Sequence, residues 1–175
     1  MSTQLSSDLR FEKRRNKAVI QFSNGETVEG NFFTGAGSVI RSGPERIGDL
    51  LNAESGFFPF EVSSEDGPQT LIYNRTYVVT VTVSSDEPRQ ELGYDVATPK
   101  SVTMRLSTGQ RLLGSIRVYR PEGHNRLSDW SKSRNQFHYL ETDGWALLVN
   151  SAHIVEVSEI QSRHRTAVPP APRRV

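Results

Sequence analysis

Apolar residues recur at every second position in several short stretches of the chain. This period of two is typical of β-strands with one buried face, and no long stretch shows a sustained helical period. Two of these stretches, 18–23 and 102–107, are each followed by a turn. The turns are Asn24-Gly25 and Thr108-Gly109, where glycine reaches positive φ without a Cβ clash. The alternating apolar residues are Ala18, Ile20 and Phe22 in one stretch and Val102, Met104 and Leu106 in the other. The pattern therefore predicts a mainly β protein with two early hairpins.

The pattern of the first part of the chain is repeated in the second part. The segment from Ala18 to Val83 is echoed from Val102 to Ile160, with an Arg-aliphatic-small-Asp block, an aromatic-led strand and an aliphatic strand ending in asparagine in each copy. The matched segments are 46–49 and 126–129, 57–61 and 137–141, 71–74 and 147–150, and 78–81 and 154–157. Two copies of about 60 residues predict two small tandem domains or two halves of one pseudo-symmetric domain.

Each copy is expected to contain about five strands and one short helical turn. The helical turns are predicted at Ile47 to Ala53 and at Leu127 to Lys132, and five short strands close most economically into a small barrel. The core candidates are Phe22, Phe32, Phe57, Phe60 and Leu71 in the first copy and Leu106, Ile116, Phe137, Leu140 and Leu147 in the second. The predicted order is a basic disordered tail (1–16), a first barrel (17–83), an acidic solvated linker (84–99), a second barrel (100–160) and a basic, proline-rich disordered tail (161–175).

Composition narrows the classes of function. The chain is 35% hydrophobic and 23% charged, which is typical of a soluble globular protein. It contains no cysteine, which excludes a disulfide framework, a thiolate zinc site and a cysteine nucleophile. The first residues are polar and basic without an apolar core region, and no segment has the length of a membrane span, so we expect a cytoplasmic protein that does not contact a membrane.

The net charge of +1 hides an uneven distribution. Residues 18–83 include three basic and eight acidic residues, whereas residues 100–160 include eight basic and six acidic residues. Opposite charges favour contact between the first unit of one molecule and the second unit of another. This contrast predicts a protein partner or a homo-oligomer.

A glycine-bearing hairpin built into a five-strand unit of this size resembles the Sm-like and SH3-like small barrels. The tandem form, with its Arg-x-x-Asp block and its aliphatic-Asn strand, is similar to an uncharacterised bacterial family of that kind. The resemblance spans about Ala18 to Ile160 and implies a module for binding or assembly. The Sm-like RNA site needs an Arg-Gly pair in the last turn, but the last turns here read Asn74-Arg75-Thr76 and Asn150-Ser151-Ala152. This departure argues against the uridine pocket and against a ring-forming Sm role.

Aromatic residues supply the candidate protein interface. The segment Phe57-Phe58-Pro59-Phe60 is too aromatic for one strand face to bury entirely, and an exposed ring favours contact with a partner. Trp130 occurs only in the second copy, where it serves either the core or an interface. The predicted interface residues are Phe57, Phe58, Phe60 and Trp130.

The basic second hairpin supports an alternative function. If Ile116 and Val118 face inward, Arg117 and Tyr119 share the outward face, a combination that suits phosphates and stacked bases. The alternative function is therefore binding of RNA or single-stranded nucleic acid through Arg105, Arg117, Tyr119 and Arg120. The simpler explanation is that a strand places its charged residues on the solvent-exposed face.

Other polar pairs have structural explanations. Arg46 with Asp49, and Arg126 with Asp129, are three residues apart and suit a capping and ion-pair role at a helix start, with a carboxylate site as the alternative. The four histidines lack metal-ligand spacing, and no phosphate loop or nucleophile elbow is found. The sequence predicts no catalytic residue, metal site or cofactor, and favours a non-enzymatic module for protein interaction or self-assembly.

Overall fold

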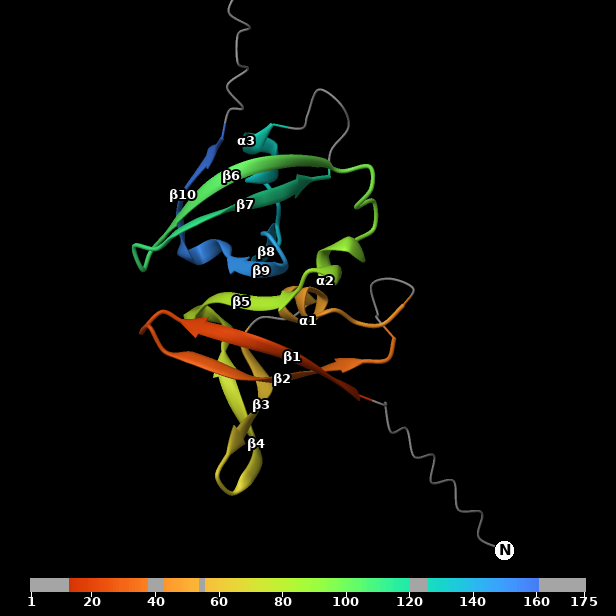
Figure 1. Cartoon of the computed structure of the whole chain (residues 1–175), viewed down its shortest axis with the longest axis vertical. Coiled ribbons are helices and arrows are strands. Elements are labelled where there is room, and N and C mark those ends of the chain that lie inside the picture. The colour runs from red at the N-terminus through yellow and green to blue at the C-terminus, as the bar shows by residue number, and fades with distance from the viewer. Residues whose placement is uncertain (1–12, 38–42, 54–55, 120–125, 161–175) are drawn as a thin grey trace, which may run out of the picture.

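The computed structural model describes residues 13–37, 43–53, 56–119 and 126–160 (Figure 1). The chain is mainly β, as predicted, with ten strands, three short α-helices and two single 3-10 turns in these residues. In chain order they are β1 (Lys13–Phe22), β2 (Thr27–Gly35), α1 (Ile47–Ala53), β3 (Phe57–Ser64), β4 (Gly67–Asn74), η1 (Arg75–Tyr77), β5 (Val78–Ser84), α2 (Asp86–Arg89), β6 (Thr98–Leu106), β7 (Arg111–Val118), α3 (Leu127–Trp130), β8 (Phe137–Glu141), β9 (Trp145–Asn150), η2 (Ser151–His153) and β10 (Ile154–Glu159).

All ten strands belong to one antiparallel sheet with the neighbour order β10-β6-β7-β8-β9-β5-β1-β2-β3-β4. The predicted pair of separate five-stranded barrels is not found, because β5 pairs with β9 and joins the two halves into a single sheet that does not close. Small units of this kind bury too little surface alone, and a shared strand pair adds hydrogen bonds and core between them. The two predicted hairpins are confirmed as β1–β2 and β6–β7.

The first half of the sheet, β1 to β5, and the second half, β6 to β10, have the same neighbour order. The local registers also agree: Phe57 pairs with Asn74 in the β3–β4 hairpin, and Phe137 pairs with Asn150 in the β8–β9 hairpin. A 3-10 turn follows each asparagine, whose Oδ1 accepts a hydrogen bond from the N–H two residues on, at 2.9 Å for Asn74 and 3.0 Å for Asn150. Residues at matched positions of the two halves can therefore be compared directly.

Two glycines allow neighbouring strands to approach closely. A Cβ atom at Gly30 would lie 2.0 Å from the carbonyl oxygen of Glu61, and one at Gly114 would lie 2.5 Å from that of Glu141. Both distances are shorter than real Cβ contacts, so only glycine fits at these positions, where β2 lies against β3 and β7 lies against β8.

The core consists of two hydrophobic clusters, one in each half. Most predicted core residues are buried, but Phe57 is 62% exposed and its prediction as a core residue was wrong. Leu71 is half-buried. The first cluster also contains three side chains of the second half, which are Phe137, Ala146 and Leu148.

The segment 84–99 is solvated, as predicted, over part of its length, since Leu92 and Val96 are 91% and 87% exposed. It differs from a simple linker at helix α2, where Glu87 and Pro88 are buried. Strand β1 begins at Lys13, so residues 13–16 of the predicted N-terminal tail belong to the sheet. The rest of that tail and the predicted C-terminal tail, 161–175, lie outside the described residues.

Candidate functional site

The sheet has two open edges, β4 and β10. Among the described strands, β4 pairs only with β3, and β10 pairs only with β6. The two edges lie at opposite ends of the molecule, with the β3–β4 hairpin projecting from the lower end and β10 at the upper end (Figure 1). An open edge presents unpaired backbone N–H and C=O groups along its length.

Between these edges, β5 and β9 form the junction that joins the two halves. Their antiparallel register pairs Thr80 with Val149, Val81 with Leu148, and Ser84 with Trp145. We call this contact, together with the packing of α1 on β8, the inner junction. Strand β5 is buried on both faces there, because one face contacts the first core cluster and the other contacts the second.

Apolar side chains cross the inner junction in both directions. Phe137 and Leu148 of the second half are 1% and 0% exposed and belong to the first core cluster. Val79 of the first half is 0% exposed and belongs to the second cluster. The junction is therefore a continuous piece of core, and each half completes the core of the other.

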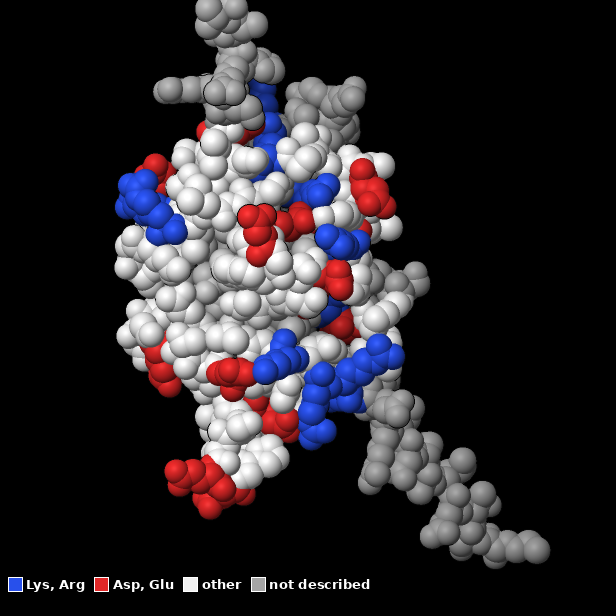
Figure 2. Space-filling view, viewed as in Figure 1, with Lys and Arg blue, Asp and Glu red and all other residues white. Residues whose placement is uncertain are grey.

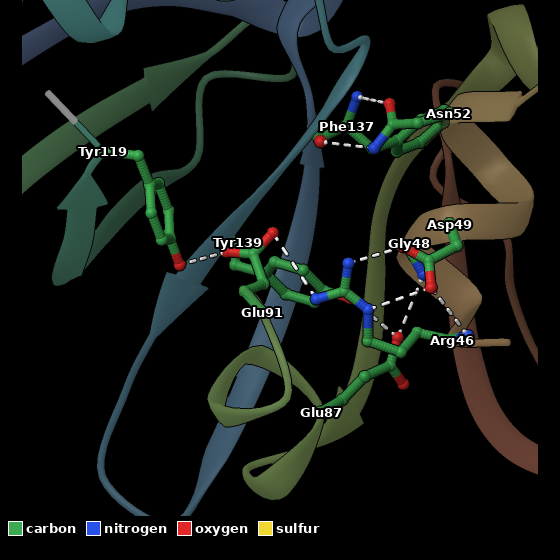
Figure 3. Close-up of polar contacts among 9 residues, drawn as sticks. All are labelled: Arg46, Gly48, Asp49, Asn52, Glu87, Glu91, Tyr119, Phe137 and Tyr139. Carbon is green, nitrogen blue, oxygen red and sulfur yellow. Dashed lines mark hydrogen bonds and ion pairs between the residues drawn. The ribbon is translucent and has the colours of Figure 1, made fainter. Parts of the chain in front are cut away.

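Two asparagines make polar contacts across the inner junction. The side chain of Asn52 in α1 imitates a neighbouring strand: its Nδ2 donates to the carbonyl oxygen of Phe137 at 3.0 Å, and its Oδ1 accepts from the N–H of Phe137 at 2.9 Å (Figure 3). Asn150, which is fully buried, donates through Nδ2 to the carbonyl oxygens of Arg75 at 3.2 Å and Val78 at 2.7 Å. These bonds satisfy backbone groups that the junction buries.

A buried carboxylate lies beside α1 at the inner junction (Figure 3). Glu87 Oε1 accepts hydrogen bonds from the N–H of Gly48 at 3.0 Å and from the hydroxyl of Tyr139 at 2.9 Å. Burial raises the pKa of the Glu87 carboxyl above its ordinary value of 4.5, while these two donors and the charge of Arg46 act in the opposite direction. Burial and the neighbouring Glu87 likewise raise the pKa of Tyr139, so the phenol stays protonated and continues to donate.

The Arg46–Asp49 pair lies next to this carboxylate. The N–H of Arg46 donates to Asp49 at 3.1 Å and its guanidinium forms an ion pair with the same carboxylate, which confirms the predicted capping and ion-pair role. Arg46 also reaches Glu91 at 3.5 Å, and Glu91 accepts a hydrogen bond from Tyr119. Burial raises the pKa of the Glu91 carboxyl, with Tyr119 and Arg46 acting in the opposite direction. These contacts join the segment from Glu87 to Glu91 to the start of α1.

The predicted protein interface is only partly at the surface. Phe58 and Phe60 are 1% and 0% exposed, because they point from β3 into the first core cluster, so neither lies at the surface of a single molecule and the core prediction for Phe60 is confirmed. Phe57 points the other way and is exposed beside Ile72 of β4, which is 63% exposed. Phe57 and Ile72 thus form an apolar patch at the β4 edge.

A groove of ≈ 510 Å³ lies beside the other edge, β10. Trp130 of α3 lines it and packs against His138 with the ring centroids 4.7 Å apart, so the predicted interface residue Trp130 does lie at a surface hollow. Its lining is mixed: the apolar side chains are Leu127, Trp130, Ile154 and Val157, and the polar ones are His138, Glu156, Ser128, Ser131, Ser133 and Ser151. Val155 of β10, also in the lining, is 54% exposed.

The basic residues of the alternative nucleic-acid face are paired with acids. Arg117 Nε donates to Glu141 at 3.0 Å and its Nη2 donates to the hydroxyl of Tyr94 at 2.8 Å. Arg105 forms an ion pair with Glu156 at 3.1 Å, and Tyr119 donates to Glu91. Arg120 lies outside the described residues. Positive and negative side chains are interspersed over the face in view, with acidic groups gathered at the tip of the β3–β4 hairpin (Figure 2). Nucleic-acid binding stays a prediction that no contact in the described residues favours.

No three His, Asp or Glu side chains in the described segments are grouped so that they could hold a metal ion. Within the same segments, no helix is long and apolar enough to cross a membrane. Comparison of the chain with protein-family models, with curated proteins and with solved structures finds no match.

Sequence reasoning missed the residues that build the inner junction. Asn52, Glu87 and Tyr139 come from a helix, the linker and a distant strand, and no spacing in the sequence links them. The sequence did hold a signal that Phe57 is exposed. Phe58 and Phe60 lie in the same short strand, and one strand face cannot bury all three rings.

Proposed function

We propose that the protein is a non-enzymatic interaction module that binds other protein chains by strand addition at the open edges of its sheet. The observation that carries this proposal is the exposure of Ile72, 63%, on the unpaired β4 edge and of Phe57, 62%, two residues along the neighbouring strand β3 from the residue that pairs with Ile72. Strand addition uses edge backbone groups for affinity and alternate side chains for specificity.

The β4 edge lacks most of the usual protection against pairing. Natural edge strands carry lysine, proline, inward-pointing charges or bulges that discourage association, and of these β4 has only Pro68. Strand β4 reads Gly-Pro-Gln-Thr-Leu-Ile-Tyr-Asn, with no charged residue and with a proline only near its start, where an edge strand tolerates it. An uncharged edge with exposed Phe57 and Ile72 favours a surface that is covered in the functional state.

The architecture behind this function is also part of the proposal. We take the two halves to be copies of one small-barrel-like unit, related to the Sm-like and SH3-like barrels. After joining, the first half exposes the β4 edge, which we call the donor edge, and the second half exposes the β10 edge, which we call the acceptor edge. Because the matched halves share neighbour order and hairpin register, the duplication supports this interpretation. A cytoplasmic site of action is the simplest one for a cysteine-free chain of this composition.

Affinity capture tests the proposed function. The full chain and its Ile72→Arg variant serve as baits in a lysate of the organism that supplies the gene, with Leu113→Arg as a matched control because Leu113 is 66% exposed on an interior strand. We expect proteins, identified by mass spectrometry, that the wild type and the Leu113→Arg control retain and the Ile72→Arg variant loses. Equal recovery on all three baits would show that the edge does not mediate binding.

A further inference from the structure

The inner junction indicates what binds the open edges. We infer that the partner is a second copy of this chain, with β4 of one molecule added antiparallel to β10 of the next, in the arrangement that β9 and β5 adopt within one molecule. This inference rests on the proposed function and specifies its partner.

The two strands that pair at the inner junction hold different places in their halves. In the second half, β9 is the fourth strand, and in the first half, β5 is the fifth strand, so the inner junction joins a fourth strand to a fifth strand. The two strands left open are the fourth strand of the first half, β4, and the fifth strand of the second half, β10. The molecule therefore presents at its ends the same two kinds of edge that already pair inside it.

Exposed apolar residues at the ends match buried ones at the inner junction. Phe57 is 62% exposed and its counterpart Phe137 is 1% exposed, while Ile72 is 63% exposed and its counterpart Leu148 is 0% exposed. On the opposite edge, Val155 is 54% exposed and corresponds to Val79, which is 0% exposed. Both sides of the proposed contact thus carry the apolar residues that the inner junction buries, left uncovered in a single molecule.

The groove beside β10 is the counterpart of the space that Phe137 and Leu148 fill. Its lining residues Leu127, Ile154 and Val157 occupy the positions of Ile47, Val78 and Val81, all members of the first core cluster. In the first half that space is filled by side chains from the second half. In the second half it is open, with a volume of ≈ 510 Å³, and Phe57 and Ile72 of another copy have matching positions and chemistry to enter it.

Asn74 supplies a polar counterpart to this apolar match. Its Oδ1 accepts from Thr76 in the local turn, as the Oδ1 of Asn150 does from Ala152. The Nδ2 of Asn150 donates across the inner junction, whereas the Nδ2 of Asn74 has no hydrogen-bond acceptor in the described part of the chain. At the proposed contact this amide would face the carbonyl oxygens of Ser151 and Ile154 of the next molecule.

Transferring the inner register predicts which residues pair between molecules. Val157 would lie opposite Ile72, Glu156 opposite Tyr73, and Ile160 opposite Gln69, so no two like charges face each other. Glu156 already pairs with Arg105 of its own sheet at 3.1 Å. The donor half carries five more acidic than basic residues and the acceptor half two more basic than acidic ones, which favours this orientation of approach.

A contact between two different edges is heterologous, so each molecule can use both edges at once. Such assemblies grow head to tail, and they end as rings where the rotation closes or as open chains where it does not. The inference therefore predicts oligomers beyond a dimer whose size follows from closure.

The first experiment uses variants at exposed residues, which leave the folded chain intact. Sedimentation velocity of the full chain should show oligomers, whereas Ile72→Arg and Val155→Arg should each sediment as monomers with an unchanged circular dichroism spectrum. Leu113→Arg, equally exposed but away from both edges, should assemble like the wild type. Asn74→Asp keeps the turn acceptor and loses the outward amide, and it should weaken association about tenfold or more.

The second experiment mixes the two monomeric variants. Ile72→Arg retains an intact acceptor edge and Val155→Arg an intact donor edge, so an equimolar mixture should form a heterodimer and nothing larger. A wild type that stays monomeric up to its solubility limit, or variants that do not complement each other, would overturn the inference. If in that case the affinity capture still recovers another protein through the β4 edge, the proposed function holds with a different partner; if it recovers none, both fail.

Discussion

At the scale of single residues, the matched asparagines Asn74 and Asn150 show how one local device takes on a second role. Both cap a 3-10 turn through Oδ1, and this shared role is what the turn chemistry of the sequence predicts. Only Asn150 also uses its amide across the inner junction, where it is fully buried. The same side chain is thus a local cap in one half and a cap and junction contact in the other.

Replacement of each asparagine by aspartate separates the two roles. Asn150→Asp places a carboxylate against the carbonyl oxygens of Arg75 and Val78 in a buried site, and we expect a loss of about 3 kcal/mol in the free energy of unfolding. Asn74→Asp keeps the cap and faces solvent, so its loss should stay within about 0.5 kcal/mol. Urea unfolding of both variants measures the difference, and equal losses would contradict the junction role of Asn150.

Glu87 predicts a pH-dependent contribution to stability. Because burial raises the pKa of Glu87 in the folded state above 4.5, the folded protein binds this proton more tightly than the unfolded chain does. The contribution is fully present below the unfolded pKa and is lost as the pH rises through the folded pKa.

The Glu87→Gln variant isolates this effect. Glutamine retains an oxygen acceptor for Gly48 and Tyr139 and cannot ionise, so the difference in unfolding free energy between variant and wild type should move in favour of the variant as the pH rises from 4.5. Thermal or urea unfolding across this pH range gives the difference. Glu91, whose pKa is raised in the same direction, is present in both proteins and cancels. A difference that does not change with pH would show that Glu87 is not the titrating group.

At the scale of elements, α1 and α3 occupy matched places but have different neighbours. Helix α1 packs on β8 of the other half and is fixed there by Asn52, whereas the matched residue, Lys132, is exposed and lies two positions beyond the end of α3. Both helices were predicted at the correct positions, because an Arg-x-x-Asp block spans the start of each, with the arginine just before the helix and the aspartate in its first turn. What each helix covers depends on which strand of the other half lies beside it.

Alanine at these two matched positions tests the role of α1. Asn52→Ala leaves the N–H and the carbonyl oxygen of Phe137 without their side-chain partners, and we expect a loss of about 2 kcal/mol in unfolding free energy. Lys132→Ala removes an exposed side chain and should change stability by less than about 0.5 kcal/mol. Hydrogen exchange at the Phe137 amide should quicken in the first variant only. Unchanged protection there would refute the role assigned to Asn52.

At the scale of the whole molecule, the two halves share one sheet and exchange core residues. Phe137, Ala146 and Leu148 lie in the cluster of the first half, and Val79 lies in that of the second, so neither half has a complete core alone. Interdependence of this kind favours a single cooperative unfolding transition.

Spectroscopic probes of different halves can check this cooperativity. Both tryptophans, Trp130 and Trp145, belong to the second half, whereas far-ultraviolet circular dichroism follows the strands of both halves. In the Ile72→Arg variant, chosen so that association does not contribute, the two signals should report the same urea midpoint. A lower midpoint for one probe would mean that the halves unfold independently.

The sequence by itself determined the mainly β class, the hairpin turns and the places of α1 and α3, because these depend on local alternation, on glycine or asparagine at turns and on capping residues within a few positions. It also showed the similarity between the two parts of the chain, and the two halves of the sheet share one neighbour order. Only the tertiary structure decided that β5 pairs with β9, that Phe57 is exposed where Phe137 is buried, and that Glu87 is enclosed by α1 and β8. The reason is physical: matched strands have matched local preferences, and which one is covered depends on whether another strand is within reach of its edge.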